Sequence, residues 1–79
     1  MFVYQFNCYS SDEVDVSLTT HYYSNLKKAY GEYKILVQAA DTGKVLSYAR
    51  VAGVIKKEGR YFSSFTFLLS VSITKLQVL

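Results

Sequence analysis

The spacing of apolar residues changes twice along the chain, and these changes constrain the fold more than any other feature. Apolar and polar residues alternate over residues 2–9 and again over residues 14–20, which is the period of a β-strand. The polar cluster at residues 10–13 between the two runs is typical of a turn. We therefore predict an N-terminal β-hairpin. The residues that share one face of its first strand are Phe2, Tyr4, Phe6 and Cys8.

From Ser24 the apolar spacing lengthens to three and four residues, the stripe of an amphipathic helix. Its members are Leu26, Ala29, Tyr30, Tyr33 and Val37. Ser24 is a suitable N-cap, because its hydroxyl can accept a hydrogen bond from a free amide of the first turn. Gly31 lies inside this segment and costs about 1 kcal/mol relative to alanine. We predict one long helix that ends at the Asp41–Gly43 turn.

Residues 45–58 fit two structures. As a helix, they have Ser47 as N-cap, two lysines in the last turn, and Gly59 at the position where a left-handed backbone is usual. As a strand, residues 45–51 would form a hairpin with residues 35–39. We favour the helix, because the cap, the lysines and the glycine all agree.

The tail returns to aromatic and β-branched residues, which favour strands. Residues 61–78 indicate two strands with a break near Leu69–Ser70. We therefore predict one α+β domain spanning residues 1–79. It has a small antiparallel sheet, made of the N-terminal hairpin and the C-terminal strands, with one long helix and a second helix in the order ββ–α–α–ββ.

The positive charge is concentrated in the middle of the sequence. The whole chain has a net charge of +3, but residues 1–23 carry three acids and residues 24–60 carry eight basic and three acidic residues. Two helices in this basic segment resemble a helix-turn-helix, whose second helix enters the DNA major groove. The predicted nucleic-acid contacts are Lys27, Lys28, Arg50, Lys56, Lys57 and Arg60. The alternative is that these are solvated helix faces, with the lysines of the last turn offsetting the helix dipole.

Tyrosine supports a rival hypothesis. The chain has eight tyrosines, and tyrosine is enriched at protein interfaces. This composition suits an inhibitor or adaptor that acts on a host protein. The predicted partner contacts are Tyr22, Tyr23, Tyr48 and Tyr61. Exposed strand edges also suggest a homodimer.

Catalytic and metal-binding patterns are weak. His21 is the only histidine and Cys8 the only cysteine, so neither a multi-histidine metal site nor an internal disulfide can form. The four glycines match neither a phosphate-binding loop nor a dinucleotide fingerprint. We therefore predict a protein that is not an enzyme and has no cofactor. The lone thiol and the lack of a leader or a spanning segment favour the cytoplasm and no membrane contact.

Three short segments carry a family resemblance. Residues 23–30 (YSNLKKAY), 46–48 (LSY) and 55–61 (IKKEGRY) resemble small uncharacterised accessory proteins of tailed bacteriophages. The resemblance covers about half the chain. It implies an accessory factor that acts on host machinery or nucleic acid, in the host cytoplasm if phage-encoded, and it assigns no role to a particular residue.

Overall fold

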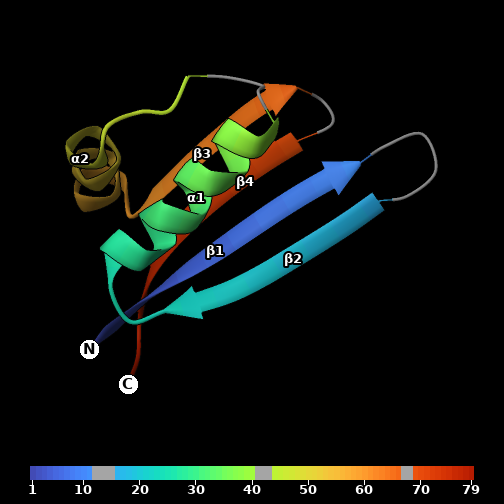
Figure 1. The fold of residues 1–79 in the computed structure, drawn as a ribbon. Coiled ribbons are helices and arrows are strands. Elements are labelled where there is room, and N and C mark those ends of the chain that lie inside the picture. The colour runs from blue at the N-terminus through green and yellow to red at the C-terminus, as the bar shows by residue number, and fades with distance from the viewer. Residues whose placement is uncertain (12–15, 41–43, 67–68) are drawn as a thin grey trace.

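A computed structural model describes residues 1–11, 16–40, 44–66 and 69–79. The elements are β1 (Phe2–Ser11), β2 (Val16–Tyr23), α1 (Leu26–Ala40), α2 (Tyr48–Glu58), β3 (Arg60–Thr66) and β4 (Leu69–Gln77), arranged as in Figure 1. The predicted ββ–α–α–ββ order and the α+β class are therefore confirmed.

The four strands form one antiparallel sheet in the order β2–β1–β4–β3. Phe6 on β1 lies between His21 on β2 and Ile73 on β4, and Ile73 in turn lies opposite Tyr61 on β3. Helix α1 packs against β1 and β2, and α2 packs against β3 and β4 (Figure 1). The sheet thus has one face covered by helices and one uncovered face, an arrangement common for antiparallel sheets.

The core lies between the helices and the central strands. The predicted stripe of α1 is confirmed, since Ala29, Tyr33 and Val37 are fully buried. Helix α2 contributes Val51 and Ile55. The buried residues of the sheet are Phe6, Cys8, Tyr61, Leu69, Val71 and Ile73. The alternation of residues along β1 therefore predicted correctly which face of this strand is buried.

The N-cap of α1 differs from the prediction by one residue. The amide N–H of Lys28 donates to Oδ1 of Asn25 at 3.0 Å, and the helix begins at Leu26. Ser and Asn are about equally good N-caps, so the prediction of Ser24 was wrong by one residue. The predicted turn at Asp41–Gly43 lies outside the described residues.

The helical interpretation of residues 45–58 is confirmed over α2, and the strand alternative is wrong there. The Ser47 hydroxyl oxygen accepts a hydrogen bond from the Arg50 amide at 3.3 Å. At the other end, Gly59 has φ 77° and its N–H donates to the Ile55 carbonyl at 2.7 Å. Ser47 and Gly59 therefore cap the two ends of α2, as the sequence predicted.

The two predicted C-terminal strands are confirmed, but the break between them lies slightly earlier than predicted, because β3 ends at Thr66 and β4 begins at Leu69. Leu69 and Ser70 lie within β4, where they pair with Ser10 and Tyr9 of β1. That pairing joins residues far apart in the sequence, so the local pattern could not show it. The same pairing includes Ser10 in β1, although the sequence placed it in a turn, and residues 12–15 lie outside the described part of the chain.

A cluster of tyrosines joins α1 to the rest of the core. The Tyr33 and Tyr61 hydroxyls lie 3.2 Å apart, and the Leu46 amide donates to the Tyr33 hydroxyl at 3.3 Å. The Tyr30 hydroxyl donates to the Leu46 carbonyl at 2.7 Å, and the Tyr48 ring meets the Tyr30 ring edge-on. Buried tyrosine hydroxyls normally need such partners. Several tyrosines are therefore structural.

Candidate functional site

The outward side of α2 carries a shallow hollow of about 510 Å³. Arg50, Gly53 and Lys57 line it at spacings of three and four residues, so they lie along one face of the helix. The other lining residues are Leu46, Ala49, Val54 and Glu58. Two cationic side chains therefore flank a floor made largely of small or apolar groups.

Gly53 forms part of that floor, and no packing contact requires a glycine at this position. A Cβ added at this position would meet nothing within 4 Å, and Gly53 is exposed in the interior of α2. Glycine at such a position costs about 1 kcal/mol relative to alanine. What the glycine does provide is bare helix backbone that a ligand can approach closely.

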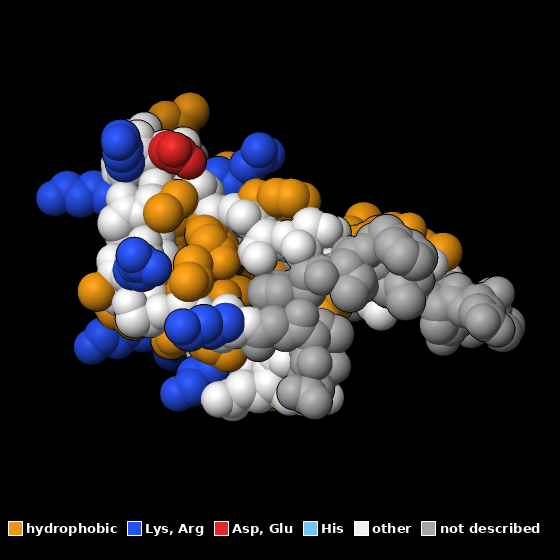
Figure 2. All heavy atoms as spheres, turned by 90° about the horizontal axis from the view of Figure 1, so that it is seen from above, with side chains coloured by type: hydrophobic (Ala, Val, Ile, Leu, Met, Phe, Trp, Pro, Cys, Tyr) orange, Lys and Arg blue, Asp and Glu red, His pale blue; other side chains and the backbone are white. Residues whose placement is uncertain are grey.

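The predicted basic residues are all exposed, but they do not form a single site. Arg50 and Lys57 line the hollow, and Lys56 lies beside them on α2. Lys27 and Lys28 lie in the first turn of α1, which Figure 1 places at the same end of the sheet as α2. Figure 2 shows Lys and Arg side chains spread around this end, with hydrophobic atoms between them.

Arg60 lies apart from the hollow. It opens β3 opposite Thr74, which pairs with Gln5 on β1. Gln5 alternates with buried Phe6, so this row of residues is on the uncovered face of the sheet. The structure therefore supports Arg50 and Lys57 as one pair and places Arg60 on a different surface.

The four tyrosines predicted to contact a partner protein do not form one exposed surface. Tyr61 is 6% exposed and belongs to the core, and Tyr48 is half-buried. Tyr23 is also half-buried; burial raises its pKa, and the negative charge and hydrogen bond of Glu32 raise it further. Among the four predicted contacts, only Tyr22 is largely exposed, at 62%. The core role of Tyr61 follows from its pairing opposite Ile73, which the sequence does not reveal.

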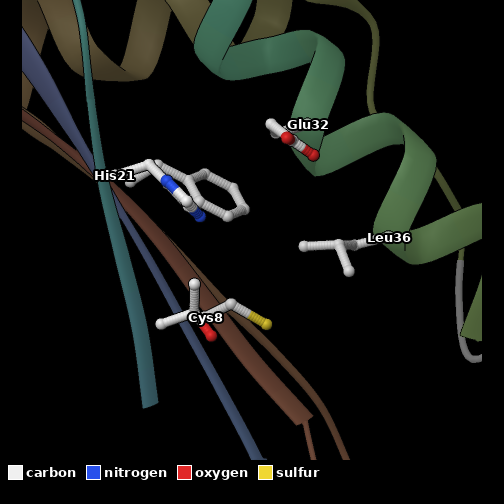
Figure 3. A pocket seen from close by; sticks show the side chains of 6 residues that line it. Cys8, His21, Glu32 and Leu36 are labelled. Atoms are coloured by element: carbon white, nitrogen blue, oxygen red, sulfur yellow. The ribbon is translucent and has the colours of Figure 1, made fainter.

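A second, smaller cavity of about 150 Å³ lies between α1 and the first two strands (Figure 3). Its polar lining includes Cys8, His21 and Glu32. The sequence gave no reason to group them; the strand register, with Phe6 opposite His21 and Cys8 opposite Thr19, brings them together.

This cavity does not match a thiol-based active site. Burial raises the pKa of the Cys8 thiol, which keeps it protonated at neutral pH, whereas the nucleophile is the thiolate. Among the described residues, no three His, Cys, Asp or Glu side chains are grouped so that they could hold a metal ion. The hollow on α2 is therefore the stronger candidate site.

Within the described part of the chain, every helix is too short or too polar to cross a membrane. No protein-family model matches the chain, and no similar curated protein or solved structure was found.

Proposed function

We propose that this protein is a non-catalytic binding module that contacts nucleic acid through the outward face of α2. The observation that supports this proposal is the hollow in which Arg50 and Lys57 flank Gly53. Arginine and lysine are the side chains that meet phosphates and guanine edges. The exposed backbone at Gly53 lets a sugar–phosphate strand lie close to the helix.

The charge around α2 supports the same ligand. Lys44 and Lys56 are exposed close in sequence to the two ends of α2, while Glu58 is the acid that lines the hollow. Affinity for nucleic acid comes from several phosphate contacts acting together. Lys27 and Lys28, at the same end of the sheet (Figure 1), would extend the contact beyond α2.

The alternative, an inhibitor or adaptor that binds a host protein through tyrosines, has less support. Three of its four contacts are buried or half-buried, and two of these, Tyr48 and Tyr61, pack against other tyrosines. Tyr22 is the one predicted partner contact that is largely exposed. Phage origin and a site of action in the host cytoplasm remain predictions from the sequence, and they suit either ligand.

Filling the hollow tests the proposal without removing a charge. Gly53→Leu places a side chain over the floor, and we expect it to weaken binding to a short oligonucleotide by about tenfold, or 1.4 kcal/mol. Gly31→Leu is the matched control, because Gly31 is also inside a helix and also has nothing within 4 Å of an added Cβ. Fluorescence anisotropy gives both affinities. Equal affinities for the two variants would refute the assignment to this hollow.

A further inference from the structure

The two edges of the sheet are protected to different degrees. The strand order leaves β2 and β3 as edge strands. β3 begins with Arg60, has a register irregularity between Ser64 and Thr66, and packs against α2. Charge, irregular pairing and a covering helix are the usual means by which proteins block an edge.

β2 lacks the charge and the irregular pairing, although α1 packs against it as α2 packs against β3. The eight residues of β2, VSLTTHYY, include no Lys, Arg, Asp, Glu or Pro, and all eight pair with consecutive residues of β1. Every side chain from Val16 to Tyr22 is exposed, and β2 lies at the outer edge of the sheet (Figure 1). β2 therefore presents a regular row of backbone donors and acceptors of the kind that templates another strand.

The aliphatic residues of β2, Val16 and Leu18, point away from the helices. Since buried Phe6 lies opposite His21, the alternate residues of β2 share the uncovered face. These include Val16 and Leu18, which are 64% and 69% exposed. A shift of one residue would place them on the helix-covered face.

Side-chain hydrogen bonds on the uncovered face oppose such a shift. The Thr20 hydroxyl donates to Oδ1 of Asn7 at 2.6 Å, and Nε2 of Gln5 donates to the Tyr22 hydroxyl at 3.1 Å. Both bonds join β2 to β1 in the observed register. The outward apolar residues are thus a fixed property of this hairpin.

We propose that β2 pairs antiparallel with β2 of a second copy of this chain, extending the two sheets into one of eight strands. The two-fold axis would be perpendicular to the sheet, so both helix layers lie on one side. The apolar residues of the two β2 strands then share the uncovered face and can contact one another across the new junction.

The charge distribution favours a second copy over other partners for this edge. β2 is uncharged, so two copies meet no like-charge repulsion across the paired strands. In the sequence, an acidic segment precedes β2 and Lys27 and Lys28 follow it. Because antiparallel pairing reverses one strand relative to the other, the acidic side of β2 in one copy is matched with the basic side of β2 in the second copy. Self-pairing therefore brings charge complementarity with it.

The test is a lysine substitution on each edge strand. Leu18→Lys puts a charge on β2, and Phe62→Lys is the matched control, since Phe62 is 59% exposed on β3. We expect the wild-type protein and Phe62→Lys to be dimers by sedimentation velocity at micromolar concentration. Leu18→Lys should raise the dimer dissociation constant by about tenfold or more, with an unchanged circular dichroism spectrum.

Hydrogen exchange distinguishes edge pairing from stacking of the uncovered faces. Edge pairing predicts that amides of β2 become protected as the dimer forms, while those of β3 do not change. A wild-type protein that is monomeric across the micromolar range overturns the proposal, as does a dimer that leaves β2 amides unprotected. The proposal does not use the hollow on α2, so either can fail without the other.

Discussion

The Tyr33 and Tyr61 hydroxyl oxygens lie 3.2 Å apart and join the centre of α1 to the start of β3. Their rings also meet edge-on, with centroids 5.5 Å apart. Tyr33 has a second role, because its hydroxyl accepts the Leu46 amide just before α2. One side chain therefore connects both helices to the sheet.

Removing the Tyr33 hydroxyl should destabilise the fold more than removing that of Tyr61. Tyr33→Phe leaves both the Leu46 amide and the Tyr61 hydroxyl without this partner, which should cost about 1–3 kcal/mol. Tyr61→Phe removes one bond and leaves the Leu46 bond in place, so about 1 kcal/mol is expected. Urea denaturation gives both values. A larger loss for Tyr61→Phe would contradict the central position of Tyr33.

Ionisation of Tyr33 should lower the stability of the fold at alkaline pH. Burial, together with the hydrogen bond between its hydroxyl and that of Tyr61, raises the pKa of Tyr33 from 10.0 to about 12. A phenol whose pKa is higher in the folded state stabilises the fold fully below its unfolded pKa. That contribution is lost as the pH rises from about 10 towards about 12. The free energy of unfolding should therefore decline over this range, and less steeply in Tyr33→Phe; identical slopes for the two proteins would rule out this cause.

Alanine at two glycines of the α2 region should have opposite effects. Gly53 has no positive φ and open space around it, so Gly53→Ala should stabilise the protein by about 1 kcal/mol. Gly59 has φ 77°, so Gly59→Ala should destabilise it by roughly 1–2 kcal/mol. Thermal melting of the two variants checks both signs. A destabilising Gly53→Ala would mean that Gly53 has a structural role that its open surroundings do not explain.

The predictions from sequence were most accurate where the signal is local. Ser47 and Gly59 marked the ends of α2 correctly because each acts on its own helix terminus. Alternation in β1 gave the buried face because Phe6 and Cys8 lie on a regular strand. The spacing of Arg50 and Lys57 in a helix also follows from the sequence, since residues seven apart share a helix face.

What the sequence could not provide depends on strand pairing. Tyr61 is buried because β3 sets it opposite Ile73, and no local pattern distinguishes it from an exposed tyrosine such as Tyr22. The grouping of Cys8, His21 and Glu32 around one cavity likewise requires the β1–β2 register and the position of α1. The sequence shows that apolar residues alternate in β2, but it does not show which face of the sheet they occupy.

The most direct test of the proposed function is the salt dependence of oligonucleotide binding by the wild-type protein and an Arg50→Ala, Lys57→Ala double variant. If both side chains contact phosphates, the logarithm of the affinity should fall linearly with the logarithm of salt concentration, and the slope should be shallower by about 2 in the double variant. Lys34→Glu, an exposed change on α1 that lowers the net charge by the same two units, controls for net charge. Absence of binding at about 50 mM salt, or equal slopes for wild type and double variant, would contradict nucleic-acid binding through α2.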